Sequence, residues 1–188
     1  MGWLDFLTTK RNGNTSEKFS LEWLQVDMHS HMIPGIDDGS KSLEESVALV
    51  KRLKDHGLRK IITTPHIMSE YYRNTPEIIL AGLERLKEEL QKQQVAIEIS
   101  AAAEYYIDEF FLEKIRKGEK LLTIFQNHVL VETGFIAKPL MLKEILFDME
   151  MAGYKPILAH PERYQYLMIG IFTSRQTSFL SPGFIRDR

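Results

Sequence analysis

The sequence predicts a mixed α/β fold in which parallel strands alternate with helices along the chain. Short apolar runs recur at regular intervals, and the stretches between them carry apolar residues at helical spacing. Helix-capping residues stand at several of the boundaries. Strict alternation requires crossover connections, which place successive strands parallel to one another. At 188 residues the chain is long enough to form one domain with a sizeable core.

The first half of the chain is expected to hold two strand–helix pairs. Residues 24–28 alternate as a strand does, and residues 60–64 form a second apolar run. Ser42 and Glu45 form a capping box, which predicts that a helix begins there. Thr75 is followed by a proline, a combination that favours the start of a second helix.

The second half is expected to continue the same rhythm. Residues 95–99, 129–132 and 156–159 are apolar runs of strand length. A short helix is expected over about 108–117, and a longer one over 139–151. The sequence therefore predicts five strands, each ending close to a histidine or a glutamate.

Composition divides the chain into three parts. Residues 1–20 are mostly polar after the first few positions and predict an N-terminal arm and linker. Residues 21–167 carry the strand–helix rhythm and are expected to form the domain. Residues 168–188 contain no lysine and no glutamate, and no further strand–helix pair is evident there. We interpret this atypical tail as the sign of a truncated or frameshifted version of a longer protein.

Charge and cysteine content exclude several classes of function. The net charge of −2 lacks the basic signature of a nucleic-acid binder. The sequence has no cysteine, which removes disulfides, zinc–thiolate sites and cysteine nucleophiles, and fits a reducing cytoplasm. No apolar run approaches the roughly 20 residues of a membrane span. We expect a cytoplasmic protein without a membrane span.

Ionisable side chains fall at the ends of the predicted strands. The five are His29, His66, Glu104, Glu132 and His160. In a β/α barrel the carboxyl ends of the strands converge on one face, where catalytic groups gather. Core packing does not explain five such residues in this position. Histidine and carboxylate ligands without cysteine suit zinc, manganese or iron.

The segment after the first predicted strand adds further candidate ligands. His29 and His31 are two residues apart, so their imidazoles can bind the same ion. A pair of surface histidines is the structural alternative. Asp38 lies in an Asp-Asp-Gly sequence that would be an ordinary turn elsewhere, but beside the histidines it becomes a candidate ligand. Asp27 is expected to accept a hydrogen bond from an imidazole.

The other candidates have structural alternatives of their own. His66 alone would be an ordinary loop histidine, and Glu104 or Glu132 alone would be explained by a salt bridge at the barrel mouth. Their joint placement favours a metal site. Arg163 follows His160 by three residues, and its planar guanidinium suits a phosphate, although a solvated surface arginine is the alternative.

Six short motifs together resemble the bacterial tyrosine phosphatases of the polymerase and histidinol phosphatase (PHP) superfamily, which accompany capsule and exopolysaccharide tyrosine kinases. The resemblance runs from about residue 24 to residue 166. The motifs are Asp27-Met28-His29-Ser30-His31, Asp37-Asp38-Gly39, Thr64-Pro65-His66, Ala103-Glu104-Tyr105-Tyr106, Val131-Glu132 and Ala159-His160-Pro161-Glu162-Arg163.

This resemblance implies a distorted β/α barrel of seven strands, of which about five strand–helix units are present here. It also implies up to three divalent ions, often Mn²⁺, with Fe or Zn as alternatives. In that pattern His29 and His31 hold the first ion, and Glu104 bridges the first and the second. Glu132 and His160 complete the second, while Asp38 and His66 hold the third.

The implied reaction is hydrolysis of phosphotyrosine by a metal-activated hydroxide. Arg163, Asp38 and His66 are then the expected catalytic residues, and the substrate is expected to be a tyrosine-phosphorylated protein such as the tail of a bacterial tyrosine kinase. The family pattern has a late Asp-x-His motif that this chain lacks, which predicts impaired activity. The alternatives are a phosphatase of the histidinol phosphate type and a non-catalytic remnant. An oligomer is compatible with all three.

Overall fold

The computed structural model describes residues 23–167, and the predicted arm at 1–20 and tail at 168–188 lie outside the described residues. All strand pairs within the described sheets are parallel. The strands are β1 (Val26–Asp27), β2 (Lys60–Thr63), β3 (His66–Ile67), β4 (Glu98–Ala101), β5 (Glu104–Tyr106), β6 (His128–Glu132) and β7 (Lys155–Leu158). The helices are α1 (Leu43–Asp55), α2 (Pro76–Lys92), α3 (Glu109–Arg116), α4 (Leu142–Met151) and the 3-10 turn η2 (Pro161–Arg163).

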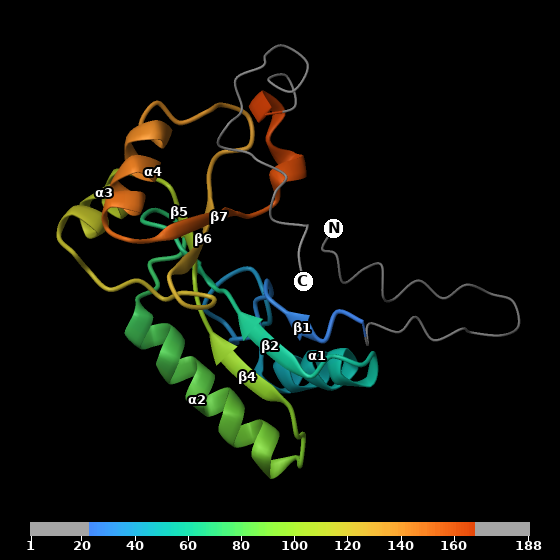
Figure 1. The fold of residues 1–188 in the computed structure, drawn as a ribbon. Helices are drawn as coiled ribbons and strands as arrows, with labels where there is room; N and C mark the ends of the chain where they lie inside the picture. Colours follow the sequence, from blue (N-terminus) through green and yellow to red (C-terminus); the bar gives the residue numbers. More distant parts are fainter. Residues whose placement is uncertain (1–22, 168–188) are drawn as a thin grey trace, which may run out of the picture.

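One sheet has the order β1-β2-β4, and helices α1 and α2 pack beside it (Figure 1). Ser42 caps α1 as predicted, since its hydroxyl accepts from the backbone N–H of Glu45 at 3.2 Å. Thr75 caps α2 with Pro76 at its first position, as the sequence indicated. Each helix buries the apolar stripe that its spacing predicted, with Val47, Val50 and Leu53 on α1 and Ile79, Leu83, Leu86 and Leu90 on α2.

The second sheet has the order β3-β5-β6-β7 and carries α3 and α4. Every residue of β6 is buried, as expected for a central strand of a parallel sheet. Asp108 caps α3, since its carboxylate accepts from the backbone N–H of Phe111 at 2.8 Å. Tyr105 and Ile145 lie in the core beneath these helices.

The chain passes from the first sheet to the second at two breaks, and between them it returns to the first sheet through α2. Strand β2 ends at Thr63 and the chain continues as β3 in the second sheet, while β4 ends at Ala101 and continues as β5. Pro65 lies in the first break, where it cannot donate a ladder hydrogen bond. Backbone bonds join the two breaks, from Ala102 N to Thr63 O at 2.8 Å and from Glu104 N to Pro65 O at 3.0 Å. Five predicted strands thus become seven shorter ones.

Two predicted boundaries were wrong for local reasons. The strand expected at 24–28 is reduced to Val26–Asp27, because Gln25 has a positive φ of 56°. The strand expected at 95–99 begins only at Glu98, because Gln94 has a φ of 55° and the N–H of Val95 still bonds to Leu90 O at the end of α2. The remaining strands and helices lie within a few residues of their expected positions.

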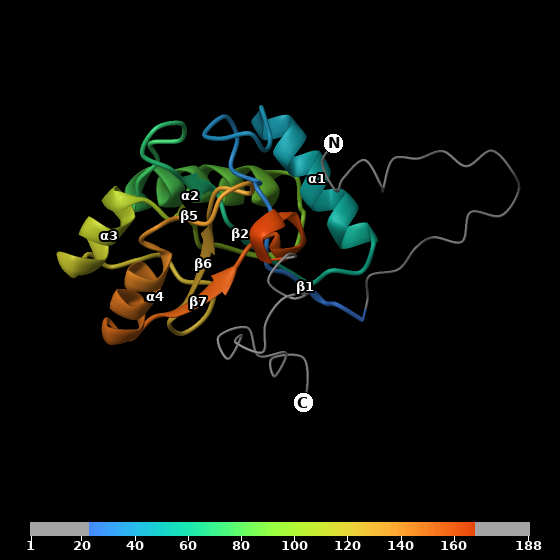
Figure 2. The same cartoon turned by 90° about the horizontal axis from the view of Figure 1, so that it is seen from above.

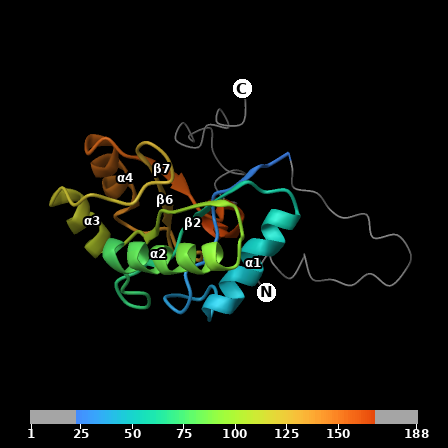
Figure 3. The same ribbon diagram turned by 90° about the horizontal axis from the view of Figure 1, so that it is seen from below.

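Seen from above and from below the view of Figure 1, helices α1, α2, α3 and α4 form an arc around the outside of the strands (Figures 2 and 3). Strands β1 and β7 are at the edges of their sheets and do not pair with each other within residues 23–167. The prediction of an α/β fold with an incomplete barrel is therefore confirmed for this part of the chain. None of the helices in the described part has the length and apolar character needed to cross a membrane.

Candidate metal centre

The carboxylate of Glu104 lies at the centre of a cluster of histidines. Glu104 is the first residue of β5, and its side chain is completely buried. Its Oε2 atom lies 3.0 Å from His29 Nε2, 3.3 Å from His31 Nε2 and 3.5 Å from His66 Nδ1. Its Oε1 atom lies 3.9 Å from His160 Nε2. Four segments of the chain therefore meet at one carboxylate.

Asp37 organises the segment that follows β1. Its Oδ2 atom accepts from His31 Nδ1 at 2.7 Å and from the backbone N–H of His66 at 3.1 Å. Its Oδ1 atom accepts from the N–H of Gly39 at 2.9 Å. Three hydrogen bonds to one buried carboxylate fix the orientation of the His31 ring and direct its Nε2 atom toward Glu104.

Gly39 is required by close packing rather than by its backbone angles. A Cβ atom at this position would collide with the Cβ and the carbonyl oxygen of His31. The backbone N–H of Ser40 donates to that same carbonyl oxygen at 3.1 Å. The loop therefore folds back directly against His31, and only glycine fits at the point of contact.

Asp38 differs from its neighbour Asp37 in exposure. Its side chain is 63% exposed, and its Oδ1 atom lies 3.7 Å from His31 Nδ1 and 3.5 Å from His66 Nε2. Because it is mostly exposed and accepts no hydrogen bond from residues 23–167 in the structure, this carboxylate stays available on the solvent side of the cluster. It closes a second group of potential ligands with His31 and His66.

His66 is surrounded on several sides. Its Nδ1 atom lies 2.8 Å from Glu132 Oε1 at the end of β6, but the two atoms are not aligned as a hydrogen bond. The ring of Tyr72 stacks on the imidazole, with centroids 5.3 Å apart and planes 10° apart. Tyr72 therefore borders the site.

Asn74 ties the loop that carries His66 to the loop that carries Asp37. Its side-chain amide donates to the carbonyl of His66 at 2.8 Å and to the carbonyl of Ile36 at 3.0 Å. The sequence showed no sign of this role, since a lone asparagine near a helix start is usually read as a cap or turn residue. Asp37 was likewise considered only as part of a turn motif.

His160 and Arg163 lie at the edge of the cluster. His160 adopts a left-handed backbone conformation with φ 48° just after β7, and its ring lies 4.6 Å from that of His29. The guanidinium of Arg163 is about half exposed and lies 5.6 Å from the centroid of Phe135. None of the described contacts of Arg163 reaches the carboxylates of the cluster, so its predicted role toward phosphate stays a prediction.

The histidines of the cluster favour the ionised form of the central carboxylate. Burial alone would raise the pKa of Glu104, but hydrogen bonds from His29 and His31 hold it well below its usual range. Burial alone would lower the pKa of His31, but its bonds to Asp37 and Glu104 outweigh burial and raise that pKa to about 10. The cluster thus pairs a negative carboxylate at Glu104 with an imidazole at His31 that retains its second proton.

The donor set fits divalent metal ions. Three groups have ligand atoms within 4.8 Å of one another: His29, His31 and Glu104; His31, Asp38 and His66; and His66, Glu104 and Glu132. Glu104 Oε1 is buried without a hydrogen-bond partner, as is expected of an oxygen directed at a cation. Imidazole and carboxylate without thiolate is a ligand set for manganese, iron or zinc.

The seven residues that the sequence singled out as ligands thus lie in one cluster, which consists of Glu104 and six residues near it or near its histidines. One expectation about the surrounding residues was wrong. Asp27 accepts from the backbone N–H of His29 at 3.4 Å instead of from an imidazole. Asp37 makes the contact with an imidazole instead, because the turn brings its carboxylate next to His31 Nδ1.

Comparison with known proteins places this site in a family. Residues 25–176 match the family described as capsular polysaccharide synthesis, CpsB/CapC. The chain belongs to this family. The match includes every residue of the cluster.

Curated relatives carry names that agree with this assignment. The chain is 28% identical over 138 residues to tyrosine-protein phosphatase YwqE of Bacillus subtilis, an alignment of 73% of this chain and 54% of that protein. It is 30% identical over 142 residues to tyrosine-protein phosphatase CpsB of Streptococcus pneumoniae, covering 76% of this chain and 58% of the relative. The chain thus spans just over half the length of the curated relatives it matches.

A solved structure supports the same relation. The fold matches one in a study of YwqE from Bacillus subtilis and CpsB from Streptococcus pneumoniae, described as unique metal-dependent tyrosine phosphatases. The TM-score is 0.70 at 27% identity, with 77% of this chain and 58% of that chain covered. The CpsB/CapC chain described here therefore shares both sequence and fold with metal-dependent enzymes.

Proposed function

We propose that this chain carries the metal centre of a metal-dependent protein-tyrosine phosphatase that hydrolyses phosphotyrosine and acts in the control of capsule or exopolysaccharide synthesis. The observation that carries the proposal is the cluster around Glu104, in which four histidines approach one buried carboxylate. Relatives that are named tyrosine-protein phosphatases and membership of the CpsB/CapC family support the substrate class.

The residues divide the work between them. Glu104, with the histidines on its two oxygens, sets the position of the ions at the centre of the site. Asp38 is the most exposed residue of the ligand set, on the side open to a substrate, and its carboxylate lies 3.5 Å from the more buried His66. When bound, divalent ions supply an activated water and neutralise the charge on the phosphoryl oxygens. Arg163 is proposed to add a guanidinium donor to those oxygens.

Manganese is the metal that we propose, with iron and zinc as alternatives. The mixture of carboxylate and imidazole ligands suits the harder members of the first transition series. We further propose that the protein acts in the cytoplasm, that its substrate is a phosphorylated bacterial tyrosine kinase tail, and that residues 21–167 form its domain. A thiol nucleophile is excluded for this chain, because its sequence contains no cysteine.

The test is phosphate release from a phosphotyrosine peptide by the purified chain, with and without added Mn²⁺. We expect turnover that requires the ion, stops with a chelator and resists a thiol-alkylating reagent. Activity that survives exhaustive chelation would refute the proposed chemistry.

Two further measurements separate the alternatives. Faster release from histidinol phosphate than from the peptide would favour a small-molecule phosphatase. Bound metal without turnover on either substrate would favour a non-catalytic protein, and failure to bind Mn²⁺ would remove the metal centre itself.

A further inference from the structure

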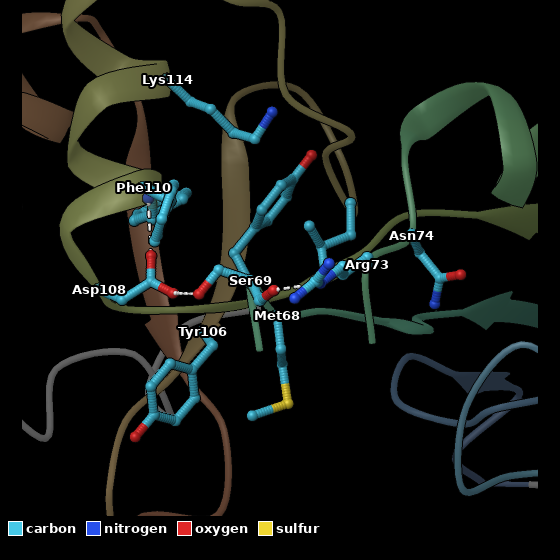
Figure 4. A pocket seen from close by; sticks show the side chains of 11 residues that line it. Met68, Ser69, Arg73, Asn74, Tyr106, Asp108, Phe110 and Lys114 are labelled. Carbon is cyan, nitrogen blue, oxygen red and sulfur yellow. Dashed lines mark hydrogen bonds between the residues drawn. The ribbon is translucent and has the colours of Figure 1, made fainter. Parts of the chain in front are cut away.

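A pocket of about 440 Å³ lies between the loop that follows β3 and the first turns of α3 (Figure 4). Its lining includes buried residues from the side of the second sheet, among them Ile67 on β3 and Phe111 on α3. Its rim carries Phe110, which is 59% exposed although it is a large apolar side chain. Arg73 and Lys114 supply positive charge at the same rim.

One wall of the pocket lies beside the candidate metal centre, although none of the candidate ligands lines the pocket itself. Met68 follows His66 by two residues and Tyr106 follows Glu104 by two residues, and both line the pocket. Glu104 and Tyr106 both belong to β5, and side chains two apart on a strand point to the same face about 7 Å apart. Tyr106 is also the register partner of Glu132 in the second sheet. One wall of the pocket therefore borders the groups that surround the proposed ions.

The charges of the pocket leave one cation available. The carboxylate of Asp108 already accepts two hydrogen bonds, from Ser69 Oγ at 2.6 Å and from the N–H of Phe111 at 2.8 Å. Lys114 pairs with Glu119 at 2.9 Å. Arg73 donates from Nε to the carbonyl of Ser69 at 2.9 Å, and no carboxylate of the described residues is within ion-pair distance of it.

We propose that this pocket binds the residue beside the phosphotyrosine in the substrate peptide. That residue is aromatic or aliphatic, and an acidic side chain next to it pairs with Arg73. The proposal rests on the proposed function and names the sequence that the substrate presents. An extended peptide advances about 3.3 Å per residue, so a residue one or two positions from the phosphotyrosine reaches a wall about 7 Å away. Phe110 supplies the apolar contact and Arg73 the charged one.

The test compares two phosphotyrosine peptides, one with an aromatic and an acidic residue beside the phosphotyrosine and one with alanines there. Turnover of p-nitrophenyl phosphate, which has no flanking residues, measures the metal centre by itself. We expect the aromatic–acidic peptide to have the higher kcat/KM. In Phe110→Ala and in Arg73→Glu, its kcat/KM relative to that of p-nitrophenyl phosphate should fall about 10-fold, the equivalent of about 1.4 kcal/mol of contact.

Matched controls are available on other surfaces. Phe147 on α4 is 60% exposed, so Phe147→Ala removes an equally exposed ring, and Arg85→Glu reverses an exposed charge on α2. Both controls should leave the two rates unchanged. Equal kcat/KM for the two peptides in the unmodified chain, or equal losses in the controls, would overturn the proposal. A change of oligomeric state in Phe110→Ala would instead assign the exposed ring to a contact between copies of the chain, and would also overturn it.

Binding measurements keep the two proposals separate. Fluorescence anisotropy with labelled versions of both peptides tests the pocket even when nothing is hydrolysed. If p-nitrophenyl phosphate and peptides are not turned over with Mn²⁺, the proposed function fails, while weaker binding of the aromatic–acidic peptide to Arg73→Glu would still support the pocket. Equal binding to Arg73→Glu and to the unmodified chain would reject the pocket by itself.

Discussion

The loop after β1 and the segment after β7 both deliver histidines to Glu104, but they are held very differently. In the first, His31 is fixed by Asp37, and Gly39 packs directly against it. In the second, the nearest carboxylate to His160 Nδ1 is that of Glu162, which is 70% exposed and 3.9 Å away. One segment holds its ligand in position through the protein alone, whereas the other leaves its ligand loosely supported.

This difference in support between His31 and His160 shows which part of the site is preorganised. A ligand that is already held by buried hydrogen bonds needs little ordering when an ion binds, while a loosely held ligand has to be ordered at that moment. We therefore expect the ion nearest His31 to bind more tightly than the ion nearest His160. The predictions below test this contrast, beginning with the residue that both segments share.

Replacing Glu104 by glutamine should have the largest effect, because it removes the charge that both segments face. We expect Mn²⁺ affinity and phosphotyrosine turnover to fall by more than about 100-fold, beyond the loss typical of a residue that only supports a ligand. Isothermal titration with Mn²⁺ and steady-state kinetics measure the two quantities. A variant that binds Mn²⁺ like the unmodified chain would show that Glu104 is a structural carboxylate.

Asp37→Asn tests the better-held segment directly. The change weakens the bond that orients His31, and we expect Mn²⁺ to bind about 10–100-fold less tightly. The equivalent change beside His160 is Glu162→Gln, which alters an exposed contact and should change affinity by less than about 5-fold. Similar losses in the two variants, measured by titration, would remove the contrast between the segments.

Gly39→Ala tests the close packing behind His31. We expect a loss of about 1–3 kcal/mol in the free energy of unfolding, because the added methyl group forces the loop away from His31. Gly134→Ala is the control, since a Cβ atom there meets only ordinary contacts. Denaturant unfolding with and without Mn²⁺ gives both values, and equal stability of the two variants would contradict the packing argument.

Arg163→Ala should have the smallest effect on the fold. Its side chain is about half exposed, so the free energy of unfolding should change by no more than about 0.5 kcal/mol. If the guanidinium contacts phosphate, KM for the phosphorylated peptide should rise about 10-fold, the equivalent of about 1.4 kcal/mol. Unchanged kinetics in the folded variant would show that Arg163 is an ordinary surface residue without a role in phosphate binding.

The sequence predicted the helices better than the strands. Ser42 and Thr75 marked helix starts correctly because a capping hydrogen bond is local, and the three or four residues that form it are adjacent in sequence. The passage of β2 into β3 and of β4 into β5 was missed. It depends on contacts between Thr63 and Ala102, which are distant in sequence and leave no periodic pattern.

The same distinction applies to the metal centre. His29 and His31 were found because two histidines at this spacing are informative by themselves, and the strand ends indicated where the others would gather. Asn74 was missed because its role is to donate hydrogen bonds to the backbone carbonyls of Ile36 and His66. No residue type in the sequence reveals such contacts with the backbone of other loops. Family resemblance supplied the grouping of ligands into separate ions, which spacing alone did not give.

The two breaks at which the chain crosses between the sheets have a consequence for motion. Proteins with two lobes commonly open and close about a hinge where few chain segments connect the lobes. Here two neighbouring crossings, bonded to each other through Ala102 and Glu104, connect the sheets at the position of the metal centre. A hinge at this place would break the centre itself. Under the proposed function, we therefore expect substrate to enter and product to leave through rearrangement of surface loops, and not through a hinge between the sheets.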